Sequence, residues 1–195
     1  MIRKLSALTL GAAVALSTAT AFAQEAGPAS SGGDMPLAMG ADLAFMLPMG
    51  DFGDASGPLL GAMFKLEHAL SPNLGFTGRI GYLFGLEKEP APGFKSSITD
   101  VPIWAGIKYY VSAPRDGFWV GAEAGLNYLT ATAKGNVLGV EFEASDSEMK
   151  FGAGARAGYR LGAVDIGAGL TMLDLGEAGD SMAVLATVGY DFTGF

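Results

Sequence analysis

The chain has 195 residues, which suits a single domain, and half of its residues are hydrophobic although 30 are glycine. It contains no cysteine, which excludes a thiolate metal site, a cysteine nucleophile and a lipid-modified cysteine. Its formal net charge of −8 at pH 7 disfavours a nucleic-acid partner. The mean hydropathy is nevertheless positive, so the many apolar residues need an explanation.

The first residues have the order of an export signal. Arg3 and Lys4 give a basic start, residues 5–16 form a short apolar run, and residues 21–23 read Ala-Phe-Ala. This order is typical of a secretory signal peptide and its cleavage site. The sequence therefore predicts a cleaved signal peptide over residues 1–23.

Two segments follow the predicted cleavage site. Residues 24–35 are small and polar, and we expect them to be flexible, whereas residues 36–195 form the predicted folded domain. This domain has no apolar run near the roughly 18 residues that a transmembrane helix needs. Its apolar residues are instead spread in alternation.

A period of two dominates the folded domain and is clearest over residues 74–86. Most even positions there are large and apolar, whereas most odd positions are glycine, threonine or arginine. This pattern predicts a β-strand with one apolar and one small or polar face. The same pattern predicts about eight strands, which cover 37–47, 58–70, 74–86, 101–111, 118–128, 149–161, 164–172 and 182–192.

The connections between these strands alternate in length. Those after the first, third, fifth and seventh strands are long, and those after the second, fourth and sixth are short. The longest predicted loop is 130–148, in which residues 137–142 could extend the flanking strands. Together these features predict an all-β, antiparallel up-and-down transmembrane barrel with short periplasmic turns and longer extracellular loops.

Charged residues set the register of this barrel. Four cations fall on the glycine-rich face, and turning the strands over would point them at lipid, at about 2–4 kcal/mol each near the midplane. Four carboxylates share that face, so we expect ion pairs inside the lumen, with Arg79 bound to Glu67 or to another acid. The predicted lumen charges are Asp42, Lys65, Glu67, Arg79, Lys108, Glu123, Arg156 and Asp165.

Aromatic residues gather near the strand ends on the short-turn side. Such residues are typical of a girdle at the membrane interface. The predicted girdle contains Phe76, Tyr109, Tyr110, Phe118, Trp119, Tyr159, Tyr190 and Phe192.

The pattern resembles the small, eight-stranded bacterial outer-membrane β-barrels typified by the transmembrane domain of outer membrane protein A. Residues 45–54, FMLPMGDFGD, resemble the region between the first strand and first loop of such barrels. The end of the chain, with Tyr190, Phe192 and Phe195, resembles the C-terminal signal that the barrel-assembly machinery recognises in this family. Phe195 differs in parity from the other two, so either residues 193–194 form a bulge or Phe192 ends the strand. No peptidoglycan-binding domain follows, so no cell-wall tether is expected.

Three functions remain open at this point. The first is a structural or surface-interaction protein of the outer membrane, with lipid and lipopolysaccharide around it and a lumen filled by paired charges. The second is a narrow channel for small solutes or ions. The third is a soluble exported barrel that binds an apolar ligand, which would require the apolar face to point inward.

No enzyme and no cofactor are expected. The single histidine, His68, falls on the outward face near a turn, and no serine is patterned beside it for a nucleophile–base pair. Acidic loop residues could hold divalent cations together with lipopolysaccharide phosphates, but no loop has the spacing of a calcium site.

Overall fold

The computed structural model describes residues 37–112, 115–137, 140–177 and 179–192, all of which belong to one compact unit, Met35–Phe195. The predicted signal peptide, the predicted flexible segment and Phe195 lie outside the described residues.

The described residues form nine strands, a short α-helix and one 3₁₀ turn. Their bounds are β1 (Leu37–Pro48), α2 (Gly50–Ala55), β2 (Leu59–Ala69), β3 (Leu74–Gly85), β4 (Lys88–Ala91), β5 (Phe94–Tyr110), β6 (Gly117–Val137), β7 (Val140–Leu161), β8 (Val164–Met172), η1 (Leu175–Glu177) and β9 (Met182–Asp191).

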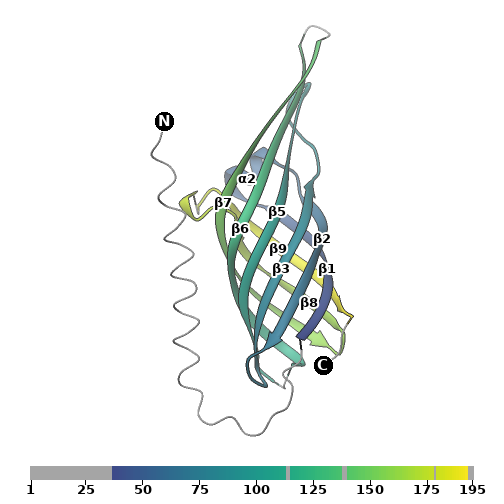
Figure 1. The fold of residues 1–195 in the computed structure, drawn as a ribbon. Coiled ribbons are helices and arrows are strands. Elements are labelled where there is room, and N and C mark those ends of the chain that lie inside the picture. Colours follow the sequence, from purple (N-terminus) through teal and green to yellow (C-terminus); the bar gives the residue numbers. More distant parts are fainter. Residues whose placement is uncertain (1–36, 113–114, 138–139, 178, 193–195) are drawn as a thin grey trace. The chain divides into compact units, whose positions relative to one another are not determined.

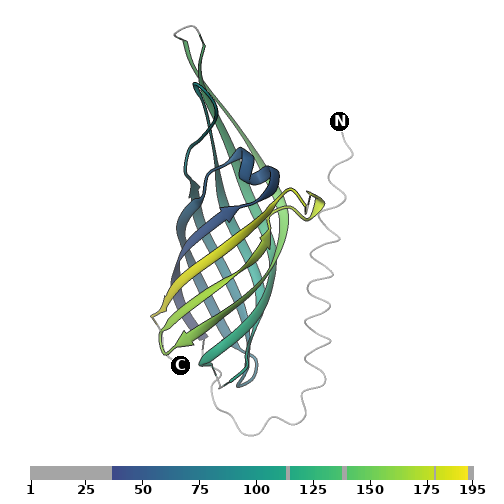
Figure 2. The ribbon, with the colours of Figure 1, turned by 180° about the vertical axis from the view of Figure 1, so that it is seen from behind.

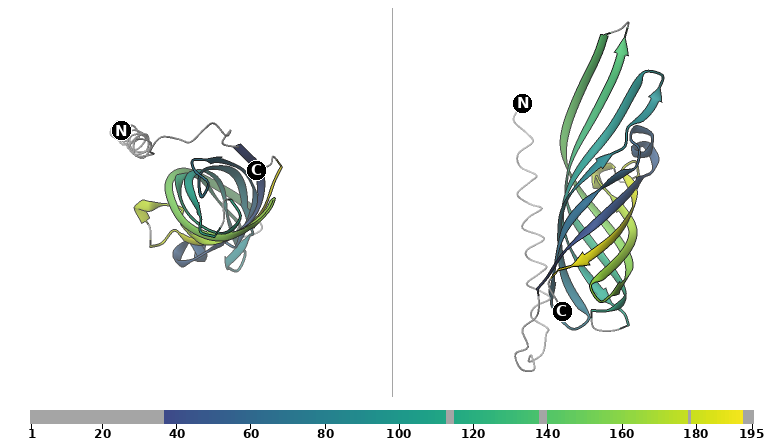
Figure 3. Two further views of the ribbon diagram at one scale, coloured as in Figure 1. Left: turned by 90° about the horizontal axis from the view of Figure 1, so that it is seen from below. Right: turned by 90° about the vertical axis from the view of Figure 1, so that its right-hand side faces the viewer.

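Eight of the strands close into a ring. Each ring strand pairs antiparallel with the ring strands before and after it in the chain, and β1 also pairs with β9. β3 pairs directly with β5, because β4 separates them only in sequence. β4 lies outside the ring because it pairs with β5 alone. The ring is visible along its axis in Figure 3, and the pairing of β1, β9 and β8 is visible in Figure 2. The predicted eight-stranded antiparallel barrel is therefore confirmed, with β4 as an additional strand.

The two faces of the barrel wall differ in polarity. Large apolar side chains near the middle of the strands point outward and are between 49% and 71% exposed; they include Leu43, Ile80, Ile103, Phe151, Ile166 and Val188. The charged residues of the same strands point inward. This register is opposite to the one that a soluble barrel with an apolar interior requires. Among the described residues, no helix has the length and apolar character to cross a membrane.

The two ends of the barrel have different connections. β2–β3, β5–β6 and β7–β8 are joined by short turns at one end, and the helix, β4 and the 3₁₀ turn lie at the other. In the turn between β7 and β8, Gly162 has a φ of +58°, in the left-handed region that favours glycine. The alternation of short and long connections in the sequence is thus reproduced in space.

The predicted loop over residues 130–148 is wrong for most of its length. β6 continues to Val137 and β7 starts at Val140, so the two strands form a hairpin that rises beyond the barrel together with β5 (Figure 1). Hydroxyl groups tie the two strands together above the apolar belt: Thr130 Oγ1 lies 2.9 Å from Ser147 Oγ, and Thr132 Oγ1 lies 3.2 Å from Ser145 Oγ. The sequence did not predict these strands because both faces of the projecting sheet are exposed to water. Small and polar residues therefore replace most of the large apolar residues that mark the lipid-facing strands.

A lipid-facing position offers a direct test of the register. Ala155 lies on the exposed face of β7, opposite Ala122 and Leu170. We expect Ala155→Arg to destabilise the barrel in lipid vesicles by about 2–4 kcal/mol, since a cation would face the bilayer. Ala155→Leu is the control of similar bulk. Equal losses of unfolding free energy in urea for the two variants would contradict the register.

Candidate functional site

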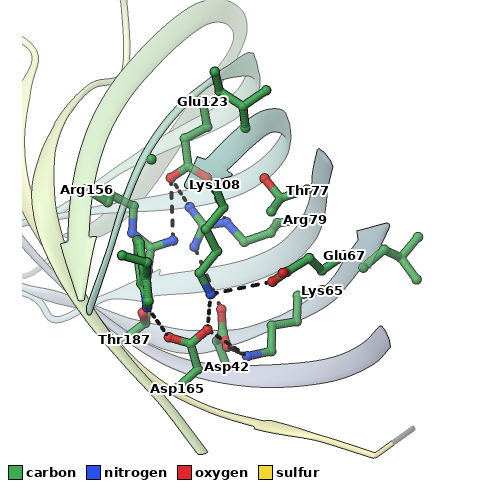
Figure 4. Close-up of a pocket in the computed structure, with 14 residues that line it drawn as sticks. Asp42, Lys65, Glu67, Thr77, Arg79, Lys108, Glu123, Arg156, Asp165 and Thr187 are labelled. Carbon is green, nitrogen blue, oxygen red and sulfur yellow. Dashed lines mark hydrogen bonds and ion pairs between the residues drawn. The ribbon is translucent and has the colours of Figure 1, made fainter. Parts of the chain in front are cut away.

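The lumen of the barrel contains the candidate site. All eight lumen charges predicted from the sequence lie there, and none of their side chains is more than 10% exposed. Figure 4 shows them converging from different strands around a small central space. The strand alternation explains this convergence, because every second residue of each strand points to the barrel axis.

The buried charges form two groups of contacts. Glu123 is at the centre of the group that lies nearer the long loops. Arg79 makes a two-point contact with it: Arg79 Nε donates to Oε2 at 3.0 Å, and Arg79 Nη2 donates to Oε1. Arg156 Nη1 lies 3.6 Å from the same carboxylate, and Arg79 Nη1 lies 3.9 Å from Asp42. Arg79 thus binds Glu123 rather than Glu67. Two-point contacts of this kind hold both partners in one orientation.

A second group of contacts lies nearer the short turns. Lys65 Nζ lies 3.0 Å from Asp42 and 3.1 Å from Asp191. Lys108 binds Asp165 and lies 3.5 Å from Glu67. Each of these cations therefore meets two carboxylates from different strands.

Arg160, Asp191 and Tyr110 also belong to this group, although none of the three is among the lumen residues predicted from the sequence. Arg160 is 1% exposed, and its Nη2 lies 2.7 Å from Asp191 Oδ2 and 3.2 Å from Glu67 Oε2. Tyr110 donates a hydrogen bond of 2.8 Å to Glu67 Oε1. The alternation along the strands could have identified two of them. Arg160 has the same parity as the inward Arg156, and Asp191 has the parity opposite to the outward Tyr190.

The complete set, here called the lumen charge network, is electrically balanced. Its five cations are Lys65, Arg79, Lys108, Arg156 and Arg160, and its five carboxylates are Asp42, Glu67, Glu123, Asp165 and Asp191. Every strand of the ring contributes at least one of these ten residues.

Tyr110 and Trp119 correct the predicted aromatic girdle. Both were expected at the membrane interface, yet they are 0% and 4% exposed and lie inside the lumen. Trp119 donates a 2.9 Å hydrogen bond to Asp165, and the Lys108 ammonium lies 4.2 Å from the centre of its ring. A Cβ on Gly167 would lie 2.7 Å from this ring, so glycine is needed there to make room for the indole. The other six predicted girdle residues are exposed.

Little space remains between these side chains. The cavity that the network surrounds has a volume of about 40 Å³. A buried water needs roughly 10–15 Å³ by this measure, so the cavity has room for about three or four waters, far less than an open path needs.

An apolar layer closes the lumen on the side of the long loops. Its members are at most 3% exposed and are here called the apolar plug: Met46, Leu59, Met63, Leu83, Trp104, Leu173 and Leu185. Asn127 fixes two of them, because it accepts a 2.8 Å hydrogen bond from Trp104 Nε1 and donates one of 2.8 Å to the Leu173 carbonyl.

Comparison with solved structures finds outer-membrane barrels of similar size. Ail, the attachment invasion locus protein of Yersinia pestis, matches with a TM-score of 0.56 and 14% identity over 80% of this chain and 97% of that chain. A complex of Ail with the heparin analogue sucrose octasulfate matches with a TM-score of 0.51 and 14% identity, over 80% and 96%. Neisserial surface protein A matches with a TM-score of 0.49 and 12% identity, over 80% and 95%. No protein-family model and no curated protein matches the chain.

The likeness to Ail identifies the architecture. The chain has the fold of the small outer-membrane β-barrels. A closed ring leaves no unpaired strand edge within the bilayer, and its apolar exterior suits lipid. This barrel is therefore a protein of the bacterial outer membrane. In barrels of this kind the short turns lie on the periplasmic side and the long connections outside the cell, and the two ends of this barrel are named accordingly.

Two other predicted features can be located on this outer-membrane barrel. Tyr190 and Phe192 of the predicted assembly signal are 56% and 62% exposed, and their ring centres are 6.1 Å apart. His68 is exposed on the outer face of β2, between Leu37 and Phe76 of the neighbouring strands. Within the described ranges, no three acidic or histidine side chains are placed to hold a metal ion.

Glu87 joins the extracellular hairpins of the barrel. Lys95 Nζ donates to Glu87 Oε2 at 3.0 Å, and Lys134 Nζ donates to Oε1 at 3.2 Å, so one carboxylate links β5 and β6 to the segment before β4. These two hydrogen bonds lower the pKa of Glu87 below its ordinary value of 4.5. The carboxylate is ionised at neutral pH.

This contact predicts a local response to acid. A depressed pKa in the folded state stabilises the hairpins above pH 4.5, and this stabilisation is lost as the pH falls through the lowered pKa. We expect amide hydrogen exchange of β4 and the start of β5 to accelerate relative to the transmembrane strands on acidification. Glu87→Gln should remove this response, and an unchanged response in that variant would exclude Glu87 as its source.

The charge network predicts a second, larger effect. Glu123→Gln leaves Arg79 and Arg156 facing each other without their shared carboxylate, and we expect a loss of about 3–5 kcal/mol of unfolding free energy. Adding Arg79→Gln restores the charge balance, so the double variant should lose less than the sum of the two single variants. Urea unfolding in lipid vesicles measures both quantities. Additive losses would show that the two residues are not coupled.

Proposed function

We propose that this protein is a non-enzymatic surface-interaction protein of the outer membrane, in which the barrel is a closed anchor and the projecting sheet presents the interaction surface. The observation that carries this proposal is the filling of the lumen at two levels. The lumen charge network occupies the periplasmic and central part, and the apolar plug occupies the extracellular part.

The filled lumen argues against the channel. An ion would have to separate buried pairs such as Arg79 and Glu123 and then cross an apolar layer without water. Removing one member of a buried pair costs about 3–5 kcal/mol, which indicates the size of the barrier. The lumen therefore acts as the packed core of the anchor.

The free edge of β7 favours an interaction role. β7 pairs with β8 only from Ala153 onward, so residues 140–152 pair with β6 on one side and, among the described residues, with no strand on the other. An exposed edge presents backbone N–H and C=O groups that an extended segment of another protein can pair with. This edge lies in the projecting part of the sheet (Figure 3).

We further propose that lipid and lipopolysaccharide surround the apolar belt and that the barrel-assembly machinery recognises the last strand. The outward rings of Tyr190 and Phe192 support the second proposal.

Conductance decides between anchor and channel. Purified, refolded protein in a planar bilayer is expected to give no steady conductance above the baseline of the bilayer, because the lumen is packed. A wide porin in the same bilayers is the positive control. Steady conductance that changes in Glu123→Ala would overturn the closed anchor in favour of an ion path through the network.

The projecting hairpin can be removed without touching the barrel. Thr130 and Ser147 face each other, so replacing residues 131–146 by Asn-Gly should leave a folded barrel with a tight turn. We expect this variant to remain folded, which is measured as a change in electrophoretic mobility between unheated and heated samples. On an array of extended peptides, it should no longer bind the peptides that the full chain binds. Equal binding by the two forms would place the interaction surface elsewhere.

A further inference from the structure

The free edge of β7 has a defined set of unpaired backbone groups. The Leu173 N–H donates to the carbonyl of Ser181, just before β9, at 3.0 Å, so the backbone groups of Met172 face the other way, toward Ala153 of β7. Backbone groups alternate in direction along an antiparallel strand. Every second residue of β7, counted from Ala153, therefore points its N–H and C=O away from β6. Where β8 has ended, these groups include those of Glu143, Ser145 and Ser147.

The two faces of the sheet beside this edge differ in chemistry. On the inner face, Phe94 and Phe142 are both 42% exposed, and their ring centres are 6.0 Å apart. Gly135 lies between them, and a Cβ there would be 2.5 Å from the Phe142 ring. Ala144, the next inner residue of β7, is also exposed. The outer face carries hydroxyl and charged side chains such as Ser145, so an added strand would meet one apolar and one polar face.

The edge strand also carries a uniform charge. Residues 140–149 contain four carboxylates and no lysine or arginine. Glu143 on the outer face and Asp146 on the inner face are exposed, and within the described ranges no lysine or arginine forms an ion pair with either. Lys134, which lies opposite Glu143, binds Glu87 instead. The unpaired backbone groups would place a ligand strand directly beside these acids, where opposite charges on facing strands attract.

From these features we propose that the edge of β7 binds a cationic, amphipathic extended segment of another protein. This inference rests on the proposed function and specifies the chemistry of the partner. The segment adds to the projecting sheet as an antiparallel strand, since antiparallel pairing is the more stable per residue. Main-chain hydrogen bonds hold it, and alternate side chains give the specificity. Basic residues of the partner lie opposite Glu143 and Asp146, and apolar residues lie opposite Phe142 and Ala144.

Two labelled peptides, blocked at both ends, test the chemistry of the partner. Thr-Lys-Thr-Val-Lys-Ile has the proposed pattern in the antiparallel direction, and its neutral analogue has glutamine in place of both lysines. We expect the purified, refolded protein in detergent micelles to bind the cationic peptide about fivefold more tightly, because two cross-strand ion pairs are gained. Fluorescence anisotropy measures both affinities. In the double variant Glu143→Gln and Asp146→Asn, the two peptides should bind equally.

Asp54→Asn is the matched control for charge. Asp54 is an extracellular acid with a 91% exposed side chain, and it lies outside β7. This variant should keep the fivefold preference for the cationic peptide.

A proline tests whether the peptide binds as a strand. Ser145→Pro removes one N–H at the free edge and leaves the pairing with β6 in place, since proline is tolerated on an edge strand where its N–H would face solvent. We expect it to weaken binding of the cationic peptide by about tenfold or more, because main-chain hydrogen bonds are lost. Ser145→Ala, which loses the same hydroxyl, should bind normally. N-methylation of the second threonine of the peptide, opposite Ser145, should act like the proline.

Three results would overturn the proposal. Equal affinities for the cationic and neutral peptides would show a different partner chemistry at the edge and would leave the proposed function standing. Binding that neither Ser145→Pro nor N-methylation weakens would show attraction by surface charge without strand pairing. Binding of neither peptide would reject this partner, whereas the interaction surface itself is rejected only by equal array binding of the full chain and the hairpin deletion. If Ser145→Pro has the same electrophoretic mobility before and after heating, and so is not folded, the N-methylated peptide decides.

Discussion

A cation that faces lipid near the bilayer midplane costs about 2–4 kcal/mol, and this cost constrains the whole structure. It directs Lys65, Arg79, Lys108 and Arg156 inward in four different strands. Once they are inside, these cations require partners, because a buried charge without one is unstable. Together the cations and their carboxylate partners come from every strand of the ring, so the contacts that neutralise the buried charges also hold the strands of the barrel together.

The lumen combines two kinds of packing that depend on each other. In the central and periplasmic part, charged groups bind one another around a cavity of about 40 Å³. In the extracellular part, the apolar plug keeps bulk water away from those groups. Water that reached the pairs would weaken their attraction by raising the local dielectric constant. Asn127 joins the two regions, since it binds Trp104, whose ring also lies 5.4 Å from the Arg79 guanidinium.

Strand parity predicted the barrel, its number of ring strands and the inward position of the eight lumen charges. The parity of a residue predicts which face of the barrel wall it occupies. It does not predict which strand lies across the lumen from it or how far neighbouring strands are shifted in register. Lys65 lies opposite Arg79 in register, and Glu67 lies opposite Thr77 on the same pair of strands. Arg79 binds neither of these two residues; it binds Glu123 of β6. Tyr110 and Trp119 had inward parity, but their position near the strand ends suggested a membrane interface, and the sequence did not show that the room left by Gly167 is filled by the Trp119 indole. The hairpin over residues 130–148 was predicted as a loop because strands that are exposed to water on both faces mostly carry small or polar residues at the alternate positions where lipid-facing strands have large apolar ones.

The free edge of β7 also bears on how copies of the protein meet in a crowded membrane. Two unprotected edges of one sequence can pair antiparallel with each other and aggregate. Here Glu143, Asp146 and Glu148 lie on this stretch of strand, so self-pairing would bring carboxylates of two copies close together. Like charges on directly opposing strands are destabilising. The acids therefore disfavour homotypic association and leave the edge open to strands that carry basic residues.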